Sequence, residues 1–161
     1  MTYDNEVSIS MIARSQNEAF ARIAAAAFTA PLDPLLSDLT DIKTAVSEAV
    51  TNAIIHGYEN REGYVFITFR SSGNDIYITV TDEGVGIEDL EQAMTPLYTS
   101  KPELERSGMG FTVMQTFMDN VDVTSAPGRG TTVEMRKTIL RQGYKSDLGC
   151  LFSGLGNAGE R

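Results

Sequence analysis

Three polar side chains follow one another at four-residue steps within residues 48–57: Glu48, Asn52 and His56. In a helix this spacing places them along one face. A carboxylate there can accept the proton of an attacking hydroxyl, and an amide oxygen one turn later can ligate Mg²⁺, which prefers hard oxygen donors. His56, near the end of such a helix, can instead meet the helix dipole or the last carbonyl groups. A solvated helix face is the simpler alternative, so this segment alone does not define a site.

A second segment, DEGVGI at residues 82–87, starts with a carboxylate at the end of a strand-like pattern. Gly84 and Gly86 permit tight backbone turns and the close approach of a ligand. Asp82 could accept a hydrogen bond from an exocyclic amine such as that of adenine. The alternative is an ordinary acidic turn, because Asp and Gly are favoured in loops after strands.

The third segment, SGMGF at residues 107–111, places Gly108 and Gly110 just before an expected helix. Backbone amides at a helix N-terminus attract anions, and Lys101 and Arg106 in the preceding loop offer cations for a terminal phosphate. The spacing matches neither the P-loop nor the dinucleotide fingerprint. A glycine-rich helix entry with solvated charges is the alternative for this segment alone, but the three segments together predict an ATP pocket.

The elements that must position these residues follow from hydrophobic periodicity and from Gly and Pro punctuation. The pattern predicts a mixed α and β chain without repeats. A weakly patterned stretch of about a dozen residues, 95–107, is typical of a functional loop or lid. We expect strands at 7–13, 64–70, 76–81, 121–125 and 131–138, and helices at 17–28, 39–56, 88–94 and 111–118.

Composition sets the remaining bounds. A length of 161 residues predicts one compact domain over 1–140, followed by a Gly-rich, poorly ordered tail at 141–161. The net charge of −9 disfavours nucleic acid and anionic membrane partners. Cys150 is the only cysteine, so the chain cannot form an internal disulfide, which is typical of proteins in a reducing intracellular compartment. The longest apolar run, 23–28, is far too short to span a membrane. We therefore expect a cytoplasmic protein.

The three segments resemble the N, G1 and G2 boxes of the GHKL ATPase superfamily. The segments at 46–58, 96–111 and 15–22 resemble those of the sporulation anti-sigma F family, whose members are small serine kinases of endospore-forming bacteria. The likeness runs from about residue 7 to about residue 138. It implies the Bergerat fold, an α+β two-layer sandwich with helices on one face of a mixed sheet, which is compatible with the expected element order.

The resemblance also implies roles for individual residues. Glu48 would be the general base for an acceptor serine, and Asn52 would hold Mg²⁺ bound to ATP. Asp82 would bind the adenine amine, with Thr131 or Thr132 assisting through water. Arg22 would contact both the sigma factor that the family binds and the anti-anti-sigma factor that competes for it. The remaining pocket and lid positions would be Gly84, Gly86, Thr99, Lys101, Arg106, Gly108 and Gly110.

The function implied by the resemblance is twofold. The protein would sequester a sporulation sigma factor from RNA polymerase, and it would transfer the γ-phosphoryl group of ATP to a serine of an anti-anti-sigma partner. A homodimer is implied as well. The alternatives are a stress-response anti-sigma kinase, a nucleotide-gated sigma-binding module without catalysis, and the isolated ATPase domain of a histidine kinase.

Overall fold

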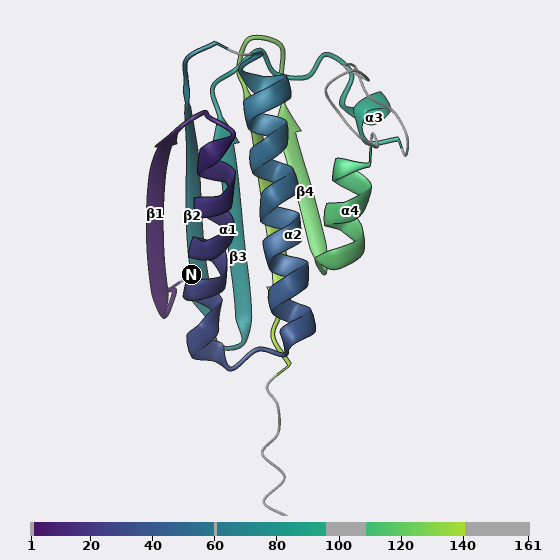
Figure 1. Ribbon diagram of the computed structural model, residues 1–161. Coiled ribbons are helices and arrows are strands. Elements are labelled where there is room, and N and C mark those ends of the chain that lie inside the picture. The colour runs from purple at the N-terminus through teal and green to yellow at the C-terminus, as the bar shows by residue number, and fades with distance from the viewer. Residues whose placement is uncertain (1, 60, 96–108, 141–161) are drawn as a thin grey trace, which may run out of the picture.

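The computed structural model describes residues 2–59, 61–95 and 109–140. Within these ranges five strands form one sheet in the order β1-β2-β3-β5-β4, and the long helices lie together on one face of it (Figure 1). This arrangement confirms the two-layer α+β fold. The strands are β1 (Asn5–Ile12), β2 (Tyr64–Ser72), β3 (Asp75–Asp82), β4 (Asn120–Ser125) and β5 (Thr131–Thr138), and the helices are α1 (Gln16–Thr29), α2 (Leu36–Asn52), α3 (Leu90–Ala93) and α4 (Gly110–Phe117).

The sheet differs from the expected mixed sheet, because every pair of neighbouring strands in the described residues is antiparallel. The reason lies in the connections. Between β1 and β2 the chain makes two helical passes, α1 and α2, which lead it away from the end of β1 and back to that same end. A single helix would instead have produced a parallel crossover. The β5 strand lies between β3 and β4 and is antiparallel to both.

The hairpin of β2 and β3 matches the expected alternation. Val65, Ile67 and Phe69 are buried beneath the helices, and the intervening residues face outward. The turn consists of the two residues between the strands, and Gly73 adopts a φ of 60° there. Such a left-handed residue suits a two-residue hairpin turn.

Helix α2 crosses the centre of the helical layer. Its residues Ile42, Val46 and Val50 are completely buried and recur at four-residue steps, as the sequence predicted. The helix begins three residues before the expected start, and its final turn, η2 (Ala53–Gly57), is a π-helix that the periodicity did not reveal. A π-turn is wider than an α-turn and is frequent at functional sites.

Two expectations lie outside the described residues: the loop over most of 95–107 and the tail at 141–161. The short helix expected at 88–94 is present as α3, although it spans only Leu90–Ala93. Among the described residues, no helix combines the length and the apolar character needed to cross a membrane.

Candidate functional site

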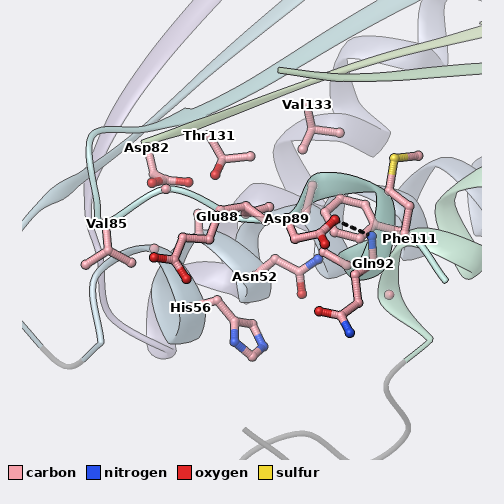
Figure 2. Close-up of a pocket in the computed structure, with 18 of the residues that line it drawn as sticks. Asn52, His56, Asp82, Val85, Glu88, Asp89, Gln92, Phe111, Thr131 and Val133 are labelled. Atoms are coloured by element: carbon pink, nitrogen blue, oxygen red, sulfur yellow. Dashed lines mark hydrogen bonds between the residues drawn. The ribbon is translucent and has the colours of Figure 1, made fainter. Parts of the chain in front are cut away.

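A pocket of about 450 Å³ opens at the end of the molecule where η2, the end of β3, the start of β5 and the start of α4 meet. This volume lies in the range of small-molecule sites in proteins. Figure 2 shows Asp82 and Thr131 from the sheet, Asn52 and His56 from the helical end, and Phe111 from α4 around this space. The pocket therefore brings together parts of all three sequence segments.

Asp82 is the buried carboxylate of the pocket, with only 4% of its surface exposed. Desolvation raises the pKa of its carboxyl group, and hydrogen bonds from the backbone amides of Gly84 and Thr131 offset part of that rise. The Gly84 amide lies 2.9 Å from Asp82 Oδ1. A buried carboxylate lining a cavity is a strong acceptor for a ligand N–H group.

The glycines of the second segment allow backbone segments to pack closely. A Cβ at Gly84 would lie 2.0 Å from the carbonyl oxygen of Gly57, which also accepts a hydrogen bond of 2.9 Å from the Val85 amide. Gly86 has a φ of 72°, and a Cβ there would meet the carbonyl oxygen of Ala126. The loop after β3 is thus held against the end of η2 and the β4–β5 turn, and this fixes Asp82 in the pocket.

The first and third segments meet at the start of α4. A Cβ placed on Gly110 would lie 3.1 Å from Asn52 Nδ2 and 3.2 Å from Glu48 Oε2. The helix N-terminus, with its partial positive charge, therefore lies directly over the amide and the carboxylate of α2. Only a residue without a side chain leaves Glu48 and Asn52 undisturbed at this position.

The structure separates the two threonines that the resemblance offered as alternatives. Thr131 lines the pocket, and its Oγ1 lies 2.9 Å from Ser125 Oγ. Thr132 pairs with Thr81 across the strands, with 3.1 Å between their Oγ1 atoms, on the sheet face away from the helices. Adjacent strand residues point to opposite faces, so Thr131 and not Thr132 is among the residues that line the pocket.

The sequence reasoning missed several residues that line the pocket. Val80 and Val133 form its apolar wall next to Asp82 and Thr131, and the alternation of the strands could have revealed both. Asp89 caps α3 by accepting a 2.8 Å hydrogen bond from the Gln92 amide (Figure 2). The helix expected at 88–94 gave no indication that Asp89 would face the pocket. The other pocket-lining residues that were not named as site residues from the sequence include Val85, Ile87, Glu88, Gln92, Met94 and Phe111.

Four of the expected lid and phosphate residues lie outside the described part of the chain: Thr99, Lys101, Arg106 and Gly108. Their roles stay predictions.

Arg22 lies on α1, away from the residues that line the pocket. Its side chain is 45% exposed, and its Nε lies 3.5 Å from Glu18 Oε1. The exposed position is compatible with a contact to another protein, which is what the resemblance implies for it.

Comparisons with known proteins agree with this geometry. The model of the family described as "Histidine kinase-like ATPase domain" matches residues 13–137. Anti-sigma F factors from Clostridium kluyveri and Thermoanaerobacter sp. are 60% and 59% identical to this chain, over 85% and 86% of its length and 96% and 97% of theirs. An anti-sigma F factor from Bacillus licheniformis is 58% identical over 84% of this chain and 93% of its own length.

A solved structure shares the fold at low sequence identity. It contains the RsbU and RsbW domains of a Mycobacterium tuberculosis protein, and it aligns with a TM-score of 0.62 and 19% identity. The alignment covers 85% of this chain and 32% of that longer one. The relatives, the family model and the nucleotide-sized pocket lead to one conclusion: the chain belongs to the anti-sigma F factor family and carries its histidine kinase-like ATPase domain.

Proposed function

We propose that this chain is an anti-sigma factor and an ATP-dependent protein serine kinase. It binds a sporulation sigma factor, and it phosphorylates a serine of the anti-anti-sigma protein that competes for it. One observation carries the catalytic part: Glu48, Asn52 and the N-terminus of α4 at Gly110 converge on one point. A base, a metal ligand and a set of backbone amides are the parts that phosphoryl transfer requires.

The nucleotide would lie along the pocket with its base near the sheet. Asp82 would accept a hydrogen bond from the adenine amine. The side chains of Val80 and Val133 would pack against the flat face of the adenine ring. The phosphates would then extend toward the N-terminus of α4, where helix amides and the helix dipole favour negative charge. A base without an amino group in the same position would leave the buried Asp82 without a donor, which favours adenine.

Asn52 would hold Mg²⁺ through its amide oxygen. Mg²⁺ is commonly bound by one or two protein oxygens together with substrate phosphates and water, so a single protein ligand beside a phosphate site fits this ion. The bound ion would neutralise charge on the phosphate oxygens.

Glu48 would accept the proton of the acceptor serine. The carboxylate lies one helical turn before Asn52 and beside Gly110, so a hydroxyl that approaches the terminal phosphate would also approach this base. In phosphoryl transfer the main contributions are positioning and charge neutralisation, and a single correctly placed base is sufficient for the proton.

The binding part of the proposal rests on the relatives and on Arg22. The 60% identical relative is named an anti-sigma F factor, and the present chain would hold the corresponding sigma factor through a surface that includes Arg22 on α1. The working unit would be a homodimer. Phosphorylation of the competitor would weaken its binding because added negative charge meets a chain of net charge −9.

Incubation with ATP labelled on its γ-phosphate and with the anti-anti-sigma protein of the same organism tests the proposal. The label is expected on a serine of that partner, and the transfer should require Mg²⁺. Sigma capture without any labelled serine would reduce the protein to a nucleotide-gated binding module. Label on a histidine would favour a histidine kinase domain.

Asn52→Ala tests the metal assignment. Removing the amide oxygen is expected to weaken Mg²⁺-dependent ATP binding about tenfold or more. The measurement is a Mg²⁺ titration of ATP binding by calorimetry. Ser37→Ala, an exposed position near the other end of the same helix, serves as the control and should leave the titration unchanged. A normal Mg²⁺ dependence in Asn52→Ala would remove this residue from the metal site.

A further inference from the structure

One carboxylate oxygen joins the exposed Arg22 to the interior of the helical layer. Glu18 Oε1 lies 3.5 Å from Arg22 Nε on the same helix, and it also accepts a hydrogen bond of 2.5 Å from Ser47 Oγ on α2. The Glu18 side chain is 20% exposed, whereas that of Arg22 is 45% exposed. The carboxylate is therefore the more buried member of the pair and is fixed to a second helix.

An ion pair between helix residues four apart is weak when both side chains are free to move, because the ordering of two long side chains offsets most of the attraction. The contact with Ser47 changes this balance. A hydrogen bond from a hydroxyl to a carboxylate is charge-assisted, and it restricts the rotamer of Glu18 before Arg22 is added. Only the arginine then loses side-chain freedom when the pair forms.

Ser47 directly precedes Glu48 in α2. The short chain Arg22–Glu18–Ser47 thus connects the surface assigned to partner binding with the helical turn that carries the assigned base. Glu48 in turn lies beside Gly110 at the start of α4. Through Ser47, the Arg22–Glu18 pair therefore contacts the helix that carries Glu48.

We propose that Glu18 is a positioning residue: held by Ser47, it orients the Arg22 guanidinium for the sigma and anti-anti-sigma partners. The inference rests on the proposed function, since it requires that Arg22 contacts a partner. It adds a role for Glu18 and Ser47, neither of which touches the partner in this scheme.

A double-mutant cycle on sigma binding tests the proposal. Arg22→Ala and Glu18→Gln are measured alone and together, with the sigma factor of the same organism as the probe and calorimetry as the readout. Glutamine keeps an oxygen that can accept from Ser47 but removes the charge that attracts Arg22. We expect Glu18→Gln to raise the dissociation constant about three- to tenfold, the effect of freeing one long side chain, and to have no further effect in the Arg22→Ala background.

Ser47→Ala provides the second arm. This change keeps the Glu18–Arg22 ion pair but removes the hydrogen bond from Ser47 Oγ that holds Glu18. Sigma binding should therefore weaken, as in Glu18→Gln, and only when Arg22 is present. ATP affinity should stay unchanged in Glu18→Gln and Ser47→Ala, whereas the melting temperature should fall, since Ser47→Ala removes a hydrogen bond between two helices. A merely structural role would weaken sigma binding whether or not Arg22 is present. Glu62→Gln, an exposed change with the same loss of charge, is the matched control.

The outcomes distinguish the positioning role of Glu18 from the partner-binding role of Arg22. If Arg22→Ala weakens sigma binding but Glu18→Gln does not, the positioning role is wrong and the partner role of Arg22 stands. If Glu18→Gln weakens binding equally with and without Arg22, Glu18 acts independently of Arg22 and the positioning role is also wrong. If Arg22→Ala itself changes nothing, the assigned partner surface is wrong and the positioning role falls with it.

Discussion

Asp82 would serve the proposed nucleotide site while it lowers the stability of the fold at neutral pH. Its carboxyl group is buried, and burial raises its pKa above the usual value of 3.8. An acid with a raised pKa stabilises the folded state below its unfolded pKa, and this contribution is lost as the pH rises through the higher folded value. At neutral pH the charged carboxylate therefore opposes folding, while its acceptor oxygens suit a bound amine.

Asp82→Asn separates these two effects. The variant is expected to be more stable than the unmodified chain at pH 7. This advantage should shrink as the pH falls from 7 to 4, because a growing fraction of the wild-type carboxyl groups, whose pKa is raised, is then protonated. ATP affinity should fall about tenfold or more, because the amide presents a donor where the adenine amine needs an acceptor. Urea denaturation at both pH values and ATP titration measure the two effects. A stability advantage that grows on acidification would contradict a raised pKa for Asp82.

Gly110→Ala probes the point where the first and third segments meet. The added Cβ would lie 3.1–3.2 Å from polar atoms of Asn52 and Glu48 and would displace both side chains. We expect phosphoryl transfer to slow about tenfold or more, because small misplacements of catalytic groups are costly. Alanine suits a helix better than glycine, so the free energy of unfolding should change by only about 1 kcal/mol or less.

The control for that variant is Thr116→Ala, which lies on the exposed side of the same helix and should leave transfer unchanged. Equal transfer rates for Gly110→Ala and the unmodified chain would show that close contact at the start of α4 is not required.

At the residue scale the sequence indicated Glu48, Asn52, Asp82 and Gly110 by type and spacing, and the structure gathers them at one end of the molecule. It could not distinguish Thr131 from Thr132. That choice depends on strand register, in which Thr131 lies opposite Asp82 and a slip of one residue would exchange the two faces. A pattern of residue types does not contain this register.

At the scale of elements, α4 is held at both of its ends. Its N-terminus meets Glu48 and Asn52, and the carbonyl oxygen of Phe117 at its other end accepts a 2.8 Å hydrogen bond from Lys137 Nζ. The ammonium group also lies 3.1 Å from Asp41 Oδ2 and 4.0 Å from Asp38 Oδ1, both on α2. Lys137 thus joins β5, α2 and the end of α4 in a cluster that is largely shielded from solvent.

Lys137→Met is expected to destabilise the fold by about 3 kcal/mol, because it leaves two aspartates without their buried cation. Asp38 would be affected most, since its Oδ2 is already buried and has no hydrogen-bond partner among the described residues. Arg136→Met is the matched control on the opposite face of the same strand. Its ion pair with Asp75 is exposed, so we expect a loss of less than about 1 kcal/mol. Thermal or urea unfolding of both variants measures the difference, and equal losses would contradict this account.

Hydrophobic periodicity predicted every strand and every α-helix of the described residues, with ends displaced by a few residues. It did not predict the π-helical turn η2. That turn ends at Gly57, where an added Cβ would lie 2.7 Å from Asp82 Oδ1. Such a contact between distant segments leaves no periodic trace in the sequence. The antiparallel pairing of β1 with β2 follows from the two helical passes between these strands. The mixed sheet was expected from the family resemblance, which does not specify the direction of each strand in this chain.

At the scale of the whole molecule, the fold separates two tasks. The pocket occupies one end of the sandwich, and Arg22 lies on the exposed surface of α1. Since α1 packs on α2, which carries Glu48 and Asn52, the proposed partner contact and the proposed catalysis would share one helical layer. Loss of the base should therefore stop phosphoryl transfer without stopping sigma capture, and binding of the sigma factor by Glu48→Gln is expected to be normal.

The central claim is that this domain transfers phosphate to a partner serine with Glu48 as the base. The most direct measurement is the single-turnover rate of label transfer from ATP to the anti-anti-sigma protein by Glu48→Gln and by the unmodified chain, with ATP affinity measured in parallel. We predict a rate at least about 100-fold lower and an ATP affinity nearly unchanged. An unchanged transfer rate in Glu48→Gln would contradict the account.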